Sequence, residues 1–234
     1  MLIDAVKLVR IVLKSIEPGQ EIYKPMFQTI NAYVSKCVNL SPRELEYFNS
    51  ILEYKVIPKR TMLLQAGKIC NFEAYVIKGC IREYYIDPHG AEVTLQFAVE
   101  DWWVSDITSF QDQKVSNMYI ETLEDCELLM LSRQSKEQLL VEVPKVERMF
   151  RLMIQRHLSA VQNRLFNTIT HTATEKYLEF LKRYPAIPQR VPQHYIASYL
   201  GISPEFLSKL RTKHLRNNSK LKKVKSSPIF TDQG

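Results

Sequence analysis

The sequence of 234 residues lacks any run of 18 apolar residues, so it offers no candidate for a helix that spans a membrane. Its apolar start is interrupted by Asp4, Lys7, Arg10 and Lys14 and has no small-residue cleavage site, which makes it a poor secretory signal. The four cysteines lie far apart, without a CxxC pair and far below the density of a disulfide scaffold. We therefore expect a cytoplasmic protein with reduced thiols and no membrane partner.

Clusters of metal-ligating or catalytic residues are also lacking. The five histidines, at positions 89, 157, 171, 194 and 214, are isolated, whereas a cupin-type oxygenase needs several histidines and a carboxylate around its metal. No Ser/His/Asp order, phosphate loop or zinc spacing is present. We therefore expect neither an enzyme nor a metal site.

Glycine is scarce, with six in the chain, so regularly placed glycines are informative. Gly67, Gly79 and Gly90 follow one another at spacings of 12 and 11 residues. They separate short segments rich in β-branched and aromatic residues, which we predict to be strands: 61–64, 74–77, 81–86, 92–99, 118–123 and 126–131. Strands with this spacing are typical of an all-β sandwich or barrel.

Helical patterns surround the strands. Ser41, Pro42 and Glu44 form a capping-box pattern before a predicted helix that runs to residue 52. Further helices are predicted at 135–143, 144–166 and 174–183. The 144–166 segment has an apolar stripe of more than five turns: Val146, Met149, Phe150, Met153, Ile154, His157, Leu158, Val161 and Leu165. This stripe would pack either on its own β-domain or on a second subunit, and we favour a homodimer.

Residues 1–25 form an N-terminal extension with apolar residues at helical spacing, broken at Pro18-Gly19 and Pro25. Three interpretations stay open for it. In the first, the helix packs on the body of the protein. In the second, it touches a membrane surface. In the third, translation normally begins at Met26 and the segment is dispensable.

The positive charge lies in the last third of the chain. Residues 1–167 hold 20 Lys and Arg against 21 Asp and Glu, whereas residues 168–234 hold 12 against 4. This asymmetry indicates an anionic partner for the C-terminal part, although a basic solvated tail would show the same charge.

Residues 193–211 have the pattern of a helix-turn-helix. Ala197 is the small residue required where the two helices cross, and Gly201 follows where the turn needs a positive φ. Ser203 is the expected N-cap of the second helix, with Pro204 at its first position. The predicted buried positions are all apolar: Ile196, Leu200, Ile202, Leu207 and Leu210. A helical hairpin with no role in DNA binding would show only part of this pattern.

In a helix-turn-helix the second helix lies in the major groove of double-stranded DNA. The outward positions that we expect to contact DNA are Ser203, Glu205, Phe206, Ser208, Lys209, Arg211, Thr212 and Lys213. Glu205 can accept from cytosine N4, and Lys209 can donate to guanine O6 and N7. Basic side chains better suited to phosphates are Arg211, Lys213, Arg216, Lys220, Lys222, Lys223 and Lys225.

A β-barrel, a long helix and a C-terminal helix-turn-helix in this order resemble the Crp/Fnr family of bacterial transcription regulators, over residues 27–216. The resemblance is carried by the helix-turn-helix and by Gln65-Ala-Gly67, residues 75–85, Gly90-Ala-Glu-Val-Thr94 and Trp102-Trp-Val-Ser-Asp106. It implies a cyclic-nucleotide-binding-type jelly roll, dimerisation along the 144–166 helix, a winged helix-turn-helix, and RNA polymerase as a further candidate partner. The pairs Tyr84-Tyr85 and Trp102-Trp103 resemble Bacteroidetes-type members.

The candidate effector pocket departs from the cyclic-AMP-binding members of this family. They hold ribose and phosphate with a Gly-Glu pair and an Arg-Ser pair, where this sequence has Ser105-Asp106 and Ser116-Asn117. Without the arginine, nothing in that loop neutralises a buried phosphate, and an unpaired buried charge is costly. We therefore expect a small-molecule effector other than cyclic AMP, or none.

The resemblance brings no cofactor with it. Oxygen-sensing members carry an N-terminal cysteine cluster for an iron–sulfur centre, and scattered cysteines do not supply four thiolates at that spacing. Haem ligation would fall to His89 or His157, but a lone histidine on a helix stripe is more often a packed core residue.

The DNA-binding part departs from the family as well. Pro204 stands where cyclic-AMP-type members carry a guanine-reading arginine, so the DNA site should differ at that base pair. Residues 215–234 lack a clean alternating hairpin and have the composition of a basic tail, which leaves the presence of a wing open.

The sequence therefore predicts an α+β protein with three parts. These are a sensor barrel at 26–143, a dimerisation helix at 144–167, and a DNA-binding domain with a basic tail at 168–234. The predicted function is a homodimeric transcription regulator. The alternative is a regulatory module that binds a ligand or a protein through its jelly roll and does not bind DNA.

Overall fold

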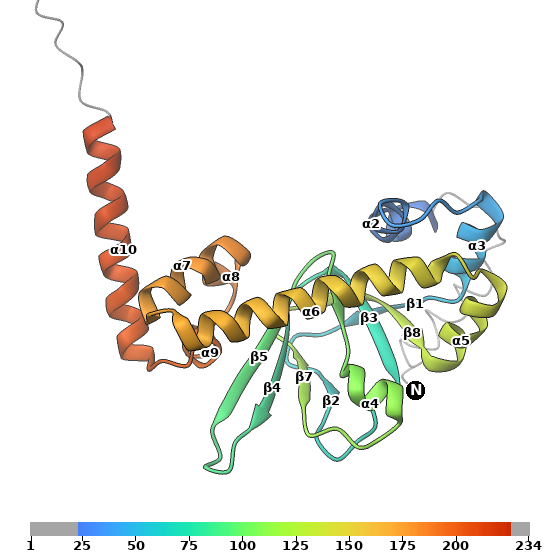
Figure 1. The fold of residues 1–234 in the computed structure, drawn as a ribbon, viewed down its shortest axis with the longest axis horizontal. Coiled ribbons are helices and arrows are strands. Elements are labelled where there is room, and N and C mark those ends of the chain that lie inside the picture. Colours follow the sequence, from blue (N-terminus) through green and yellow to red (C-terminus); the bar gives the residue numbers. More distant parts are fainter. Residues whose placement is uncertain (1–22, 226–234) are drawn as a thin grey trace, which may run out of the picture.

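The computed structural model describes residues 23–225 and has a mixed α/β architecture (Figure 1). Within these residues two helices precede the strands, one short helix interrupts them and six helices follow. The apolar positions 2–13 that predict an N-terminal helix lie outside the described residues.

The eight strands form two antiparallel four-stranded sheets. The first sheet has the order β1-β8-β3-β6, and the second has the order β2-β7-β4-β5. Their bounds are β1 Glu53–Ile57, β2 Met62–Leu64, β3 Phe72–Lys78, β4 Ile81–Ile86, β5 Glu92–Ala98, β6 Trp103–Val104, β7 Tyr119–Thr122 and β8 Cys126–Ser132. We call residues 53–132 the β-domain.

All six predicted strands are confirmed, with shifts of a few residues at their ends. The sequence analysis does not predict β1 or β6. β1 directly follows Leu52. It pairs with β8, with Glu53 opposite Met130 at one end and Ile57 opposite Cys126 at the other. Because its partner strand is distant in the sequence, local sequence patterns do not identify β1. β6 has two residues, too few for a periodic pattern. At Gly79 a Cβ atom would lie 2.5 Å from Cys126 Sγ, which explains why glycine is needed where β3 turns into β4.

The helices before and within the strands are α2 (Tyr23–Ser35), α3 (Pro42–Ser50) and α4 (Ile107–Asp112). The helices after them are α5 Arg133–Glu142, α6 Val146–Thr170, α7 Ala173–Arg183, α8 Ile187–Arg190, α9 Gln193–Leu200 and α10 Pro204–Lys225. The predicted capping box is confirmed, because Ser41 N–H donates to Glu44 Oε2 at 2.7 Å and Glu44 N–H donates to Ser41 Oγ at 3.3 Å. No helix within the described residues is long and apolar enough to cross a membrane, and all four cysteines are buried free thiols.

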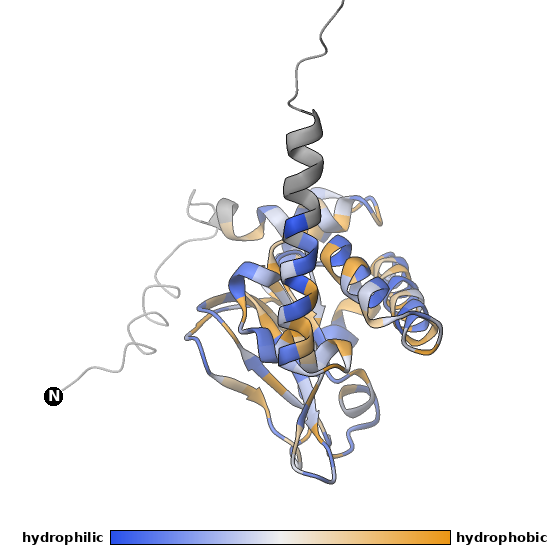
Figure 2. Cartoon of the chain, turned by 90° about the vertical axis from the view of Figure 1, so that its left-hand side faces the viewer, coloured by the Kyte–Doolittle hydropathy of each residue, from blue (hydrophilic) through white to orange (hydrophobic). Residues whose placement is uncertain are grey.

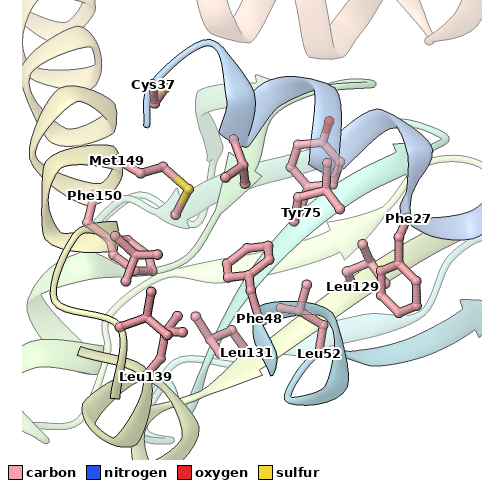
Figure 3. Packing of buried hydrophobic residues seen from close by; sticks show 14 residues of the cluster. Phe27, Cys37, Phe48, Leu52, Tyr75, Leu129, Leu131, Leu139, Met149 and Phe150 are labelled. Carbon is pink, nitrogen blue, oxygen red and sulfur yellow. The ribbon is translucent and has the colours of Figure 1, made fainter. Parts of the chain in front are cut away.

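One hydrophobic cluster joins α2, α3 and the start of α6 to the first sheet (Figure 3). In Figure 3 the side chains of Phe27, Phe48, Leu129, Met149 and Phe150 converge from these elements. The side chains of Phe48, Leu129 and Met149 are completely buried. Burial of this apolar surface fixes the first turns of α6 against the β-domain.

A second cluster joins the C-terminal helices to the second sheet. Phe97 on β5 lies against the aromatic side chains of Phe180 and Tyr184, with ring centroids 6.2 Å and 6.0 Å away. Tyr199 on α9 completes the group, 5.6 Å from Phe97. The helices α7–α10 are therefore packed on the β-domain, at the end of α6 that is distant from α3 and α5 (Figure 1).

Along α6 the apolar stripe has two parts. Val146, Met149 and Phe150 are buried in the first cluster, as the intrachain interpretation of the stripe predicts. Beyond them Met153 and His157 are half-buried, and the rest of the stripe is exposed and continues past the predicted positions to Ile169. Its exposed members are Ile154, Leu158, Val161, Leu165, Phe166 and Ile169.

Candidate nucleic-acid interface and ligand cleft

The helices α9 and α10 are joined by a tight turn of three residues. Gly201 has φ +67°, the left-handed conformation that the sequence analysis predicts there. Ser203 begins α10, because its hydroxyl accepts from Phe206 N–H at 3.2 Å and its carbonyl accepts from Leu207 N–H at 3.0 Å. Pro204 is the first residue of α10, where it loses no hydrogen bond.

The inner face of the α9–α10 pair matches the predicted one. Ala197, Leu200 and Leu207 are buried together with Ile196 and Leu210. Ile202 is only half-buried and packs at the edge of the same cluster. The buried set fixes how the two helices cross, so the opposite face of α10 has a defined orientation.

The predicted DNA-contacting residues are brought together on the outer face of the first turns of α10. Seven of them are exposed, whereas Arg211 is half-buried: Ser203, Glu205, Phe206, Ser208, Lys209, Thr212 and Lys213. Figure 2, which views the molecule from the side of α10, shows hydrophilic colours over much of its described part. Hydrogen bonds from its own backbone N–H and from Ser203 lower the pKa of Glu205, so this side chain is a carboxylate acceptor.

The basic segment after residue 214 continues α10 up to Lys225 and forms no hairpin within the described residues. Arg216 is exposed on this helix. Lys220, Lys222, Lys223 and Lys225 belong to the same helix, not to a separate tail. Eight of the twelve Lys and Arg of residues 168–234 therefore belong to α10, and the other four belong to α7 and α8.

Polar contacts hold α9 against the second sheet. Ser198 Oγ donates to the carbonyl of Glu92 at 2.7 Å and accepts from Thr94 N–H at 2.9 Å. Arg164 on α6 donates to the carbonyls of Thr94 and Tyr199 at 3.1 Å and 3.2 Å. This arrangement connects α6, β5 and α9 through one set of side chains.

A second link is made by Arg190, at the end of α8. Its guanidinium donates to Glu100 at 2.8 Å and to Glu124 at 2.6 Å. These hydrogen bonds raise the pKa of Arg190. Because both carboxylates lie in the β-domain, α8 is tied to it by a paired charge.

A cleft of about 430 Å³ lies between the β-domain and α6. Strands β3, β4, β5 and β6 and helices α2, α4, α6 and α7 contribute lining residues. Aromatic and apolar walls come from Trp102, Trp103, Met153 and Ile154. Such a volume, with mostly apolar walls and a few polar groups, is typical of a site for a small organic molecule.

Glu83 on β4 is the lining residue with the most unusual environment. Only 8% of its surface is exposed, and its Oε1 atom has no hydrogen-bond partner. The pKa of Glu83 is raised to about 8, chiefly by burial and also by the charge of Asp106, whereas a backbone hydrogen bond from Ser105 lowers it. The sequence analysis does not select Glu83, because four consecutive residues of β4 are buried and no alternation distinguishes it.

The four residues predicted for the effector pocket lie close together, but one of them lines the cleft. Ser105 lines the cleft, where its hydroxyl donates to the Phe72 carbonyl at 2.8 Å. Asp106 and Ser116 are buried, and the Ser116 hydroxyl donates a hydrogen bond to Asp106 Oδ2 at 2.6 Å. Asp106 is also the N-cap of α4, because its Oδ1 accepts from Ser109 N–H at 3.0 Å. Asn117 is exposed. Asp106 and Ser116 thus use their polar groups within the protein.

The two histidines considered for haem lie in different places. His89 is exposed in the turn between β4 and β5. His157 is half-buried and lines the cleft, where burial and the charge of Arg183 lower its pKa. Among residues 23–225 no group of three or more His, Cys, Asp or Glu is placed to hold a metal ion.

Comparison with known proteins identifies the β-domain. Residues 54–142 match the family model of the cyclic nucleotide-binding domain. The c-di-GMP-responsive global regulator CLP of Xanthomonas campestris superposes with a TM-score of 0.61 at 18% identity, over 76% of this chain and 93% of that chain. FixK2 from Bradyrhizobium japonicum gives 0.61 at 17% identity, over 71% and 86% of the two chains. A putative Crp/Fnr-family regulator from Eubacterium rectale gives 0.59 at 17% identity, over 84% and 89%.

No curated protein matches the sequence. Residues 54–142 are therefore similar to a cyclic nucleotide-binding domain, and the fold of the chain is similar to the folds of these three proteins.

Proposed function

We propose that the protein is a sequence-specific DNA-binding transcription regulator of the Crp/Fnr type and acts as a homodimer. The observation that carries this proposal is the α9–α10 pair, in which a buried inner face and the Gly201 turn present one exposed polar face of α10. The shared fold with three transcription regulators supports it.

In this proposal α9 and α10 form a helix-turn-helix, and α10 enters the major groove. Glu205 and Lys209 are exposed on its first turns, where they can reach base edges. The basic residues further along α10 contact phosphates, which supply affinity without sequence choice. Those residues are Arg211, Lys213, Arg216, Lys220, Lys222, Lys223 and Lys225.

The homodimer would form along the exposed apolar part of α6. Leu158, Val161 and Leu165 follow one another at spacings of three and four residues, so they lie on one face of the helix. A contiguous apolar face of this kind is unfavourable in water and typical of an interface. A second copy presents the same face, and a two-fold axis would pair the two helices.

The proposed division of labour follows the three predicted parts. Residues 26–143 sense a small molecule, residues 144–167 dimerise, and residues 168–234 bind DNA. The cleft supports the sensing role because it lies between the β-domain and α6, the helix proposed to hold the dimer together. RNA polymerase as a partner is supported by the resemblance to the family alone.

Selection of binding sites from random-sequence DNA by the purified full chain, without added ligand, tests this function. We expect an inverted repeat whose half-sites are one helical turn apart, about 34 Å. If nothing is recovered, repeating the selection in cell extract separates a requirement for an effector from a lack of DNA binding. A lack of DNA binding in both would favour a regulatory module that binds only a ligand or a protein.

A further inference from the structure

We propose that the cleft binds a small aromatic cation, with its positively charged N–H donors directed at Glu83 and its ring between the tryptophans and α6. This inference rests on the proposed function in one respect, since it assigns a ligand class to the sensor site of the proposed regulator. An aromatic cation carries the opposite charge to a nucleotide.

Unsatisfied polar atoms point to this cleft as a ligand site. Eight buried side-chain polar atoms of the described residues lack a hydrogen-bond partner, and four of them belong to residues that line the cleft. These are Glu73 Oε2, Glu83 Oε1, Trp103 Nε1 and Arg183 Nε. Buried polar groups are normally paired, so such a concentration indicates a bound molecule that supplies the partners.

The charge around Glu83 selects a cation. Glu83 and Asp106 are both buried, and the charge of Asp106 acts on Glu83 directly. The Asp106 carboxylate already accepts from Ser116 Oγ and Ser109 N–H, whereas Glu83 Oε1 accepts from nothing. An anionic group placed here would add to the repulsion, whereas a cation would pair with Glu83 and remove the cost of its ionisation.

The basic residues of the cleft, Arg156 and Arg183, lie on α6 and α7. Arg156 is exposed, and its Nη1 donates to Cys37 Sγ at 4.0 Å. The guanidinium of Arg183 lies 5.1 Å from the ring centroid of Trp102 and 5.4 Å from that of Tyr184. Neither arginine acts on Glu83, so its carboxyl group lacks a cationic partner among the described residues of the cleft.

The remaining walls suit an aromatic ring. Trp102 and Trp103 offer flat apolar surfaces, and the Trp103 ring centroid is 5.5 Å from that of Tyr75 behind it. Aromatic faces attract cations as well as rings. A volume of about 430 Å³ accommodates a one- or two-ring molecule with a short polar head.

The tryptophans provide the measurement. The chain has two of them, and both line the cleft, so their fluorescence reports directly on its occupancy. The full chain is titrated at neutral pH with four probes: benzamidine as the cation, benzamide as its neutral isostere, benzoate as the anion, and cyclic AMP. We expect saturable binding of benzamidine that is at least about tenfold tighter than that of the other three.

The Glu83→Gln variant keeps the shape and removes the carboxyl group that can ionise against a bound cation, and it should lose this preference for benzamidine over benzamide. Glu127→Gln on β8, outside the cleft, is the matched control and should keep it. The proposal is overturned if benzoate or cyclic AMP binds as well as benzamidine, if Glu83→Gln keeps the preference, or if none of the probes binds saturably. Because no DNA is present, each of these outcomes leaves the proposed DNA binding standing.

Discussion

The guanidinium of Arg82 lies between the rings of Tyr84 and Tyr195, 3.9 Å and 3.7 Å from their centroids. Tyr84 belongs to β4 and Tyr195 to α9, so the stack joins the β-domain to the helix pair that we propose to bind DNA. Arg82 also forms ion pairs with Glu92 and Glu121, which compensates the burial of its charge. A change of position of β4 would therefore be transmitted to α9 without an intervening linker.

Replacement of Tyr195 by leucine should weaken this junction. The variant removes one face of the cation–π stack while keeping an apolar side chain, and we expect a loss of about 0.5–2 kcal/mol in the free energy of unfolding. Urea unfolding followed by circular dichroism measures the loss. The control is Tyr85→Leu on β4, where the side chain is exposed and is not part of the stack on Arg82. Equal stability of the two variants would contradict the role given to Tyr195.

Introduction of charge into the exposed face of α6 should separate the proposed dimer. Val161→Glu places a carboxylate in the apolar stripe, and burying it in an interface without a partner is unfavourable. Sedimentation equilibrium should show a dimer for the parent protein and a monomer for this variant. Gln155→Glu, at an exposed polar position of the same helix, should remain dimeric. A monomeric parent protein would refute the interface.

Two kinds of side chain on α10 should have different effects on DNA binding. Lys209→Ala and Glu205→Ala should relax the preference for the selected sequence and leave the salt dependence almost unchanged, because they are assigned to bases. Lys222→Ala and Lys223→Ala should weaken binding to all sequences alike and lower the salt slope by about one each, because they are assigned to phosphates. Fluorescence anisotropy titrations on selected and scrambled duplexes at several salt concentrations distinguish the two; the reverse pattern would exchange the assignments.

The stability of the protein should depend on pH through Glu83. Burial raises the pKa of Glu83 to about 8, so the folded protein keeps a proton that the unfolded chain loses at a lower pH. Between the ordinary carboxyl range and pH 8 the free energy of unfolding therefore falls as pH rises. Glu83→Gln does not ionise, and its stability relative to the parent protein should increase across this window, by on the order of a few kcal/mol at most.

Urea unfolding of both proteins at about pH 5 and about pH 8 tests this dependence. The advantage of Glu83→Gln should be larger at the higher pH. A constant difference for Glu83→Gln would mean that its carboxyl group is not held neutral in the folded state.

Local turn and capping chemistry made part of the fold predictable from sequence. Gly201 and Ser203 were identified because a tight turn needs a positive φ and a helix start needs a hydroxyl acceptor, and both requirements involve adjacent residues. Most strands were found in the same way, from glycines and the turn at Asp87-Pro88. The helix α2 was not predicted, although Phe27, Ile30 and Val34 have helical spacing and are all buried.

The cleft is harder to predict from the sequence, because its position depends on which helices and strands cover each face of β4. In β4 both faces are covered, one by the interior of the β-domain and the other by α9, so Arg82, Glu83 and Tyr84 are all buried. Alternation along this strand therefore does not indicate that Glu83 faces a cleft. The resemblance to cyclic-AMP-type members points to Asp106 and Ser116 instead, and in the structure the Ser116 hydroxyl donates a hydrogen bond to the Asp106 carboxylate.

Hydroxyl-radical footprinting on a selected DNA site tests the central claim most directly, because it shows where the protein lies along the duplex. A dimer with two α10 helices in successive major grooves predicts two protected segments centred about one helical turn apart on the same face of the DNA. Val161→Glu, if monomeric, should protect a single segment and only at higher protein concentration. One protected segment for the parent protein, or uniform protection that does not depend on sequence, would contradict the account.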